Sequence, residues 1–132
     1  MHIVDDEPAV RRSVAFLLKG VGFSSFSWES GDAFLQGFSA DWRGCILLDM
    51  RMPRLSGMDV LRELKKMGSP MPVIMLAGHT DSGLSANSLK LGAFDSIEKP
   101  YEKTALLRSI AVALLSDNVD VRIPDPGPSR AS

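Results

Sequence analysis

Three acidic side chains follow two short apolar runs of the sequence. Asp5 and Asp6 come after the run His2–Val4, and Asp49 comes directly after the run Cys45–Leu48. An apolar run of this kind, bounded by polar residues, is typical of a buried strand. Because an isolated charge is costly to bury, a carboxylate at the end of such a strand has to face water, a cation or a hydrogen-bond donor.

Carboxylates gathered at one point would suit phosphoryl chemistry. Their like charges repel one another, and a hard divalent cation such as Mg²⁺, which prefers oxygen ligands, would compensate that repulsion. A carboxylate can be the nucleophile that forms an acyl phosphate, while a metal and a lysine such as Lys99 neutralise the transferring oxygens. Each motif also has a simpler reading: Asp5-Asp6 can cap a helix, and Asp49 can begin a turn.

Strands and helices alternate five times along the chain. Proline is well tolerated in a first helical turn, so Pro8 favours a helix start, while Gly20 or Gly22 ends that helix. The patterns predict strands at residues 2–4, 23–28, 45–49, 71–78 and 94–100, and helices at residues 7–20, 30–38, 56–68, 81–91 and 102–115. The helix at 81–91 is rich in Gly, Ser and Asn and has weak helical propensity.

This alternation predicts an α/β fold, a doubly wound (βα)5 parallel sheet covered by helices on both faces. Sheets of this flavodoxin-like kind commonly have the strand order 2-1-3-4-5 and bind ligands beyond the carboxyl ends of the strands, where the order reverses. That point lies between the first and third strands, so it should bring Asp5, Asp6 and Asp49 together. Lys99, in the fifth strand, should lie at the same edge.

The bulk composition is that of an ordinary globular protein. Of the 132 residues, 45% are hydrophobic and 23% charged, and the net charge of -1 gives no sign of a nucleic-acid-binding or membrane-binding surface. The single cysteine, Cys45, cannot form an internal disulfide, and no apolar run is long enough to span a bilayer, so we expect a cytoplasmic setting.

We expect one folded domain at 1–116 and a proline-rich linker or tail at 117–132. His2, Trp28 and Trp42 are interpreted as packing residues.

Four segments carry a resemblance to a known family: "HIVDDEPAVRRSVAFLL", "ILLDMRMPRLSGMDVL", "PVIMLAGHTD" and "GAFDSIEKP". Together they resemble the receiver domain of bacterial two-component response regulators, most closely its FixJ branch. The resemblance covers about Met1 to Leu115, and it implies the CheY-like form of the predicted fold.

The resemblance also implies roles for the site residues. Asp49 would be the phosphoacceptor. Asp6, Asp49 and the backbone carbonyl of Arg51 would bind Mg²⁺, with Asp5 helping through water. Lys99 and Gly78 would bind the phosphoryl group, and the Lys99–Pro100 peptide would be cis.

Further expectations from the family concern regulation and partners. Arg51 and His79 hold positions that tune phosphate lifetime, although His79 can equally be a plain exposed loop residue. A sensor histidine kinase would supply the phosphoryl group, and a downstream output domain or protein would receive the signal. The face made by the fourth helix, fifth strand and fifth helix would carry output, with a homodimer as one form. No direct nucleic-acid binding by this chain is expected.

Two positions depart from the family pattern. Ala77 stands where a Thr or Ser hydroxyl usually bonds the phosphoryl oxygen, and Ser96 stands where a Phe or Tyr usually swings inward. A hydrogen bond to a charged group contributes about 1.5–3 kcal/mol, so its loss should weaken the preference for the active state. Tyr101 could act as a substitute aromatic or could merely pack on the last helix.

Three functions therefore compete. The first is a phosphoaccepting signalling domain. The second is a pseudo-receiver, an interaction module whose output does not depend on phosphate, which Ala77 and Ser96 favour. The third is a phosphatase with an aspartyl nucleophile, but such enzymes usually carry Asp-x-Asp, and here Arg51 takes the place of the second aspartate.

Overall fold

Helices and strands alternate along the chain, as the sequence predicts. The computed structural model describes residues 1–39 and 41–122, and the side-chain surroundings up to residue 115. The strands are β1 (His2–Val4), β2 (Phe26–Trp28), β3 (Ile46–Asp49), β4 (Val73–Ala77) and β5 (Asp95–Glu98). The helices are α1 (Pro8–Gly20), α2 (Gly31–Gly37), α3 (Gly57–Lys66), α4 (Ser82–Lys90) and α5 (Lys103–Arg122).

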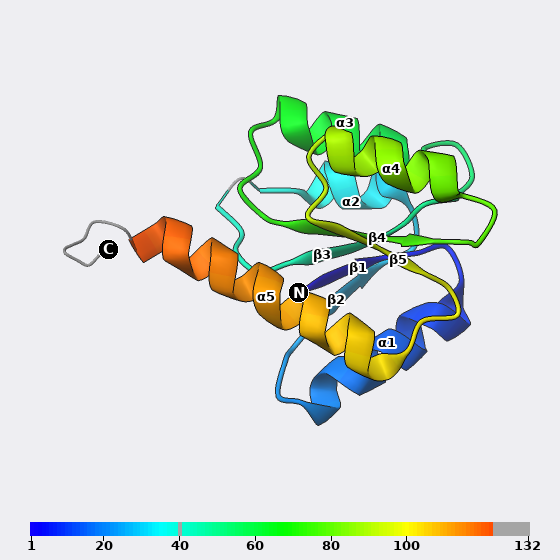
Figure 1. The fold of residues 1–132 in the computed structure, drawn as a ribbon. Coiled ribbons are helices and arrows are strands. Elements are labelled where there is room, and N and C mark those ends of the chain that lie inside the picture. The colour runs from blue at the N-terminus through cyan, green and yellow to red at the C-terminus, as the bar shows by residue number, and fades with distance from the viewer. Residues whose placement is uncertain (40, 123–132) are drawn as a thin grey trace.

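The five strands form one parallel sheet in the order β2-β1-β3-β4-β5, which confirms the predicted topology. Helices α2, α3 and α4 cover one face of the sheet, and α1 and α5 cover the other (Figure 1). The neighbours of β1 on its two sides are β2 and β3, so the strand order reverses there. The carboxyl ends of β1 and β3 therefore lie next to each other at this edge.

Strand β3 and its flanking Cys45 show why the central runs are apolar without interruption. Ile46 and Leu48 belong to the core under α2 and α3, whereas Cys45 and Leu47 belong to the core under α1 and α5. All four residues are fully buried. Because both faces of a parallel sheet are covered, consecutive side chains meet apolar surroundings on either side.

The loop that carries Asp49 into α3 is held by short-range contacts. Ser56 caps α3 by accepting a hydrogen bond from the backbone N–H of Asp59, and the Asp59 carboxylate accepts one from the N–H of Ser56 in return. A Cβ atom added at Gly57 would lie 2.3 Å from the Asp49 carbonyl oxygen, so only glycine allows this close approach. The sequence Ser56-Gly57 thus fixes the backbone next to Asp49.

Helix α4 forms despite its weak propensity, and tertiary contacts account for this. Ser88 is fully buried and donates a hydrogen bond to the carbonyl of Ser85. The Ser96 hydroxyl, on β5, donates to the Ser85 hydroxyl over 2.9 Å. The neighbouring strand therefore holds the first turns of this helix.

Helix α5 is longer than the sequence predicted, because it continues to Arg122 rather than ending at Leu115. No proline or glycine interrupts the chain between residues 116 and 122, and the first proline after it is Pro124. Figure 1 shows α5 continuing past the edge of the sheet. Of the predicted linker or tail at 117–132, residues 117–122 are thus helical, and residues 123–132 lie outside the described part of the chain.

An aromatic cluster surrounds His2 on the face of the sheet that α2 covers, as expected for packing residues. His2 is 5% exposed and stacks on Trp42 with a centroid distance of 4.5 Å. The Trp28 indole Nε1–H donates to His2 Nδ1 over 3.1 Å. Burial, with a smaller effect from the nearby amino terminus, lowers the pKa of His2 to about 4, so the ring is neutral at pH 7. Among the helices that the structure describes, none has the length and apolar character needed to cross a membrane.

Candidate functional site: an acidic pocket at the carboxyl edge of the sheet

Three carboxylates meet where the strand order reverses. Asp5 and Asp6 follow β1, and Asp49 is the last residue of β3. Their nearest carboxylate oxygens all lie within 4.8 Å of one another. Asp5 and Asp49 are buried, while Asp6 is exposed to solvent. The topology therefore gathers the acidic residues that the sequence singled out.

Lys99 reaches this group from the loop after β5. Its Nζ lies 2.8 Å from Asp49 Oδ1 and 3.7 Å from Asp5 Oδ2. Burial lowers the pKa of Lys99, but the hydrogen bond to Asp49 and the two nearby carboxylate charges outweigh burial and leave the pKa raised. The ammonium therefore remains charged at pH 7. The peptide bond between Lys99 and Pro100 is cis.

The two buried carboxylates are destabilised as anions. Burial raises the pKa of Asp49 to about 6, in spite of the Lys99 hydrogen bond, which lowers it, and Asp5 adds to the rise through its charge. Burial also raises the pKa of Asp5, although a hydrogen bond from the Glu7 backbone N–H opposes the shift. One lysine thus compensates the three acidic groups only in part.

The donor set fits a hard divalent cation. Asp5 Oδ2 is buried and has no hydrogen-bond partner, which is costly unless a cation or water completes its surroundings. The set consists of carboxylate oxygens, which suit Mg²⁺ better than a soft metal, and no Cys or His belongs to it. A cation with oxygen ligands would satisfy Asp5 and relieve the repulsion among the three anions.

A second set of residues closes the pocket on the side of α4. The pocket is a cavity of about 480 Å³, and the residues that line it include Asp6, Asp49, Arg51, Gly78, Asp81 and Lys99. The Asp81 side chain is only 2% exposed, and its Oδ1 accepts a hydrogen bond from Arg51 Nε over 2.6 Å. The hydrogen bond from Arg51 lowers the pKa of Asp81 below its usual range. Burial opposes this shift, and the hydrogen bond from the Gly78 N–H adds to it. Sequence reasoning missed Asp81, which stood out only as the start of a helix.

The comparisons with known proteins agree with this geometry. The sequence profile of the response regulator receiver domain matches residues 1–111. The chain belongs to the response regulator receiver domain family. Because this family is defined by two-component signalling rather than by turnover of a substrate, the receiver is a signalling domain and not an enzyme in the usual sense.

Individual relatives place the receiver within the family. It is 41% identical over 114 residues to the transcriptional regulatory protein FixJ of Azorhizobium caulinodans, covering 86% of this chain and 54% of that protein. It is 37% identical to the response regulator protein TodT of Pseudomonas putida, covering 86% and 50%. The crystal structure of FixJ-N superimposes with a TM-score of 0.80 at 42% identity, covering 86% of this chain and 91% of that one. The receiver thus spans about half the length of these two curated relatives.

The two atypical positions of this receiver have plain structural surroundings. Ala77, the last residue of β4, is 2% exposed and carries only a methyl group. Ser96 is half-buried and its hydroxyl donates a hydrogen bond to Ser85, so a small polar contact joins β5 to α4. His79 is exposed and is not among the residues that line the acidic cavity.

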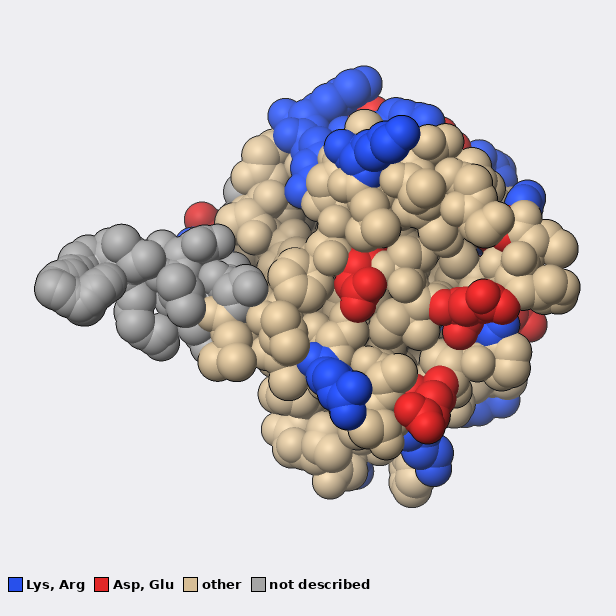
Figure 2. All heavy atoms as spheres, in the orientation of Figure 1, with Lys and Arg blue, Asp and Glu red and all other residues tan. Residues whose placement is uncertain are grey.

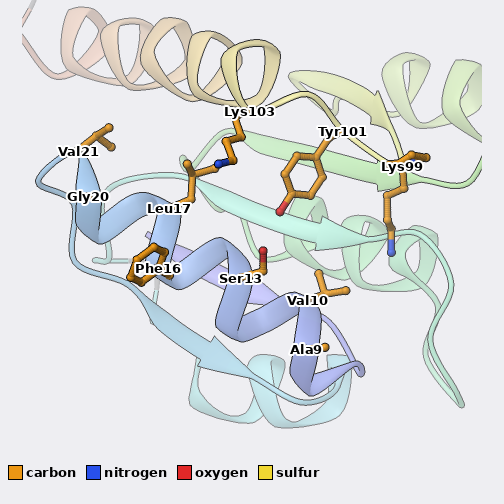
Figure 3. Close-up of a pocket in the computed structure, with 11 residues that line it drawn as sticks. Ala9, Val10, Ser13, Phe16, Leu17, Gly20, Val21, Lys99, Tyr101 and Lys103 are labelled. Carbon is orange, nitrogen blue, oxygen red and sulfur yellow. The ribbon is translucent and has the colours of Figure 1, made fainter.

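Tyr101 lies on the opposite side of the sheet from α4. It packs with the core under α1 and α5, and Figure 3 shows its ring pointing from the loop before α5 toward α1, near Ser13 and Leu17. With these residues it lines a groove of about 880 Å³ between α1 and the start of α5. The structure therefore agrees with a packing role for Tyr101.

Proposed function

We propose that this receiver accepts a phosphoryl group on Asp49 from the phosphohistidine of a sensor histidine kinase. The observation that carries the proposal is the arrangement of Asp49: a buried carboxylate at a strand end, bonded to Lys99 and next to two further carboxylates. An Asp49 oxygen attacks phosphorus, an O–P bond forms, and the P–N bond to the histidine breaks with its electron pair returning to nitrogen. The domain thus promotes its own phosphorylation, and its dephosphorylation would follow when water attacks phosphorus and the Asp49 carboxylate leaves.

The residues around Asp49 have distinct tasks in this reaction. Asp6, Asp49 and the Arg51 carbonyl would hold Mg²⁺, with Asp5 acting through water, and the bound ion would offset negative charge on the transferring oxygens. The Lys99 ammonium neutralises the phosphoryl oxygens after it exchanges its Asp49 contact for them. Gly78 lines the same cavity, and its backbone N–H, which donates to the Asp81 carboxylate in this structure, would donate to a phosphoryl oxygen.

Output is proposed to pass through the face formed by α4, β5 and α5. In Figure 2, this face is largely uncharged, with isolated acidic and basic side chains and a group of Lys and Arg along its edge over α3 and α4. Helices α4 and α5 carry the exposed apolar residues Leu89 and Val112, which are 47% and 48% exposed. Such a surface suits a protein partner or a second copy of the chain better than nucleic acid. The partner would be an output domain or protein, and the setting is proposed to be the cytoplasm.

A pseudo-receiver remains the second candidate, because specific residues favour it. Ala77 and Ser96 remove the hydroxyl and the aromatic side chain through which phosphate usually moves this face. In that case the α4-β5-α5 face would bind its partner equally well with and without phosphate, since a ligand shifts an equilibrium only by its differential affinity.

Intact mass spectrometry after incubation with a small phosphodonor separates the two candidates. With Mg²⁺, the wild type should gain the mass of one phosphoryl group, and a chelator should suppress the gain. The Asp49→Asn variant should gain nothing, whereas Asp59→Asn, the same substitution outside the pocket, should behave like the wild type. A wild type that gains no mass would favour the pseudo-receiver.

A further inference from the structure

Asp81 binds donors of two residues that line the acidic pocket, Arg51 and Gly78. Its Oδ2 accepts the Gly78 backbone N–H over 2.9 Å, and its Oδ1 accepts the Arg51 guanidinium. The backbone closes the same turn, because the Asp81 N–H donates to the Gly78 carbonyl over 2.9 Å. A nearly fully buried carboxylate thus sits in a fixed turn with one charged and one backbone donor.

Helix capping does not explain this arrangement. Asp81 is the N-cap residue of α4, but its side chain makes no capping hydrogen bond to the helix. Its carboxylate turns instead toward β4 and toward the loop after β3, where Gly78 and Arg51 lie. The contacts therefore serve the pocket side of the loop rather than the helix end.

A phosphoryl group on Asp49 would lie in the same cavity as these donors. Asp49, Arg51, Gly78 and Asp81 line one cavity, and Ala77 provides no hydroxyl that could replace a missing donor. One N–H cannot donate at full strength to two anions, and a charge-assisted hydrogen bond is among the stronger ones in proteins. Phosphate and the Asp81 carboxylate would therefore compete for the Gly78 amide.

Release of Asp81 would reach α4 directly. The Asp81 carbonyl accepts the first hydrogen bond of the helix, from the Ser85 N–H over 2.8 Å. The Ser85 hydroxyl is in turn the partner of Ser96 on β5. A shift of Asp81 thus disturbs the first turn of α4 and its contact with β5 without a hydroxyl at position 77 or an aromatic ring at position 96.

We propose that Asp81 is an internal anion that competes with the phosphoryl group on Asp49 for the Gly78 amide and the Arg51 guanidinium. The displacement of Asp81 then carries the structural effect of phosphorylation to α4. Asp81 is then a positioning residue that sets how readily this receiver accepts and keeps phosphate. The inference rests on the proposed phosphoacceptor function of Asp49.

The test compares the binding of beryllofluoride, a tetrahedral mimic of the phosphoryl group, by isothermal titration calorimetry at saturating Mg²⁺. Asp81→Asn keeps the size of the side chain but removes its charge, so it should bind the mimic about tenfold more tightly, the equivalent of one hydrogen bond to a charged group. Glu7→Gln is the matched control, because Glu7 lines the same cavity but does not bond Gly78 or Arg51. It should change the affinity by less than about threefold, as expected for a screened charge.

Two further comparisons separate competition from a structural role. Asp81→Glu retains the carboxylate and should return the affinity toward that of the wild type. In hydrogen exchange without the mimic, Asp81→Asn should speed exchange at residues 82–90, the same segment that responds when the wild type binds beryllofluoride. If Asp81→Asn does not fold by circular dichroism, Asp81→Ser takes its place in both measurements.

The outcomes distinguish this inference from the proposed function. If the wild type binds the mimic through Asp49 and Asp81→Asn gains no more than Glu7→Gln, Asp49 remains the phosphoacceptor and the role given to Asp81 is wrong. If neither wild type nor Asp81→Asn binds the mimic, the phosphoacceptor proposal fails together with the inference. A gain limited to Asp81→Asn, with faster exchange in α4, supports competition.

Discussion

Removal of the Asp49 charge should stabilise the cation-free protein, although this residue is the proposed reactive group. Burial raises the pKa of Asp49 from 3.8 to about 6, and its side chain is only 6% exposed. Each pKa unit corresponds to about 1.4 kcal/mol, so the ionised carboxylate costs about 3 kcal/mol at pH 7.5 relative to its protonated form. Asn retains an oxygen for Lys99 but removes its nearest counter-charge. We therefore expect Asp49→Asn to raise the free energy of unfolding by about 1–2 kcal/mol.

The size of this effect depends on pH, and its sign depends on the cation. Because the folded-state pKa is raised, the destabilisation is fully present above about pH 6, shrinks as the carboxylate is protonated, and is gone below the unfolded value of 3.8. The advantage of Asp49→Asn should therefore disappear between pH 7 and pH 4. Saturating Mg²⁺ should make the wild type more stable than Asp49→Asn at pH 7.5, because an ion that binds only the native wild type stabilises it.

Urea unfolding followed by circular dichroism, in chelator and in Mg²⁺, measures these differences. Asp59→Asn makes the same chemical change at a carboxylate that accepts hydrogen bonds from the Ser56 backbone and hydroxyl, so it should lower stability in both buffers. If Asp49→Asn proved less stable than the wild type in chelator at pH 7.5, the reasoning on buried, mutually repelling carboxylates would be wrong.

The remaining predictions concern the cation, the lysine, the buried histidine and the switch positions. Asp6→Asn should abolish the saturable NMR response to Mg²⁺; an unchanged titration would place the ion elsewhere. Lys99→Ala should slow phosphotransfer, followed by intact mass, more than it weakens Mg²⁺ binding, and an equal loss of both would contradict the role given to this lysine. Because the pKa of His2 is lowered, the wild type should lose up to about 3 kcal/mol of stability relative to His2→Gln as pH falls from 7 to 4. Urea unfolding measures this loss, and parallel pH profiles of the two proteins would argue against a neutral buried ring. The double variant Ala77→Thr with Ser96→Tyr should enlarge the change in hydrogen exchange at residues 79–101 on phosphorylation; an unchanged response would show that the missing pair does not limit coupling.

The topology could be predicted because the apolar runs and the turn and helix signals of the sequence all indicated the same fold. The apolar run Cys45–Leu48 alternates between two cores, and turn and helix signals bound each strand, so a covered parallel sheet was the consistent solution. Strand order then placed Asp5, Asp6 and Asp49 together without any knowledge of side-chain contacts. The end of α5 was missed because residues 116–122 are mostly polar, although they contain no helix breaker before Pro124.

Contacts between loops could not be predicted in the same way. The bonds from Arg51 and Gly78 to Asp81 join segments that follow two different strands, and no periodicity marks them. The Ser85–Ser96 bond likewise depends on how α4 lies against β5. An aspartate directly after a Gly-His-Thr loop was a signal of the first contact, but a helix start explained it equally well.

Trapping of the acyl phosphate tests the central claim most directly. After reaction with a small phosphodonor and Mg²⁺, borohydride reduces an aspartyl phosphate to homoserine, and peptide mass spectrometry then locates the changed residue. We expect homoserine at position 49 alone, with none in protein treated with chelator. Homoserine at Asp5, Asp6 or any other position, or no homoserine from wild type that is folded and bound to Mg²⁺, would contradict the assignment of Asp49 as the phosphoacceptor.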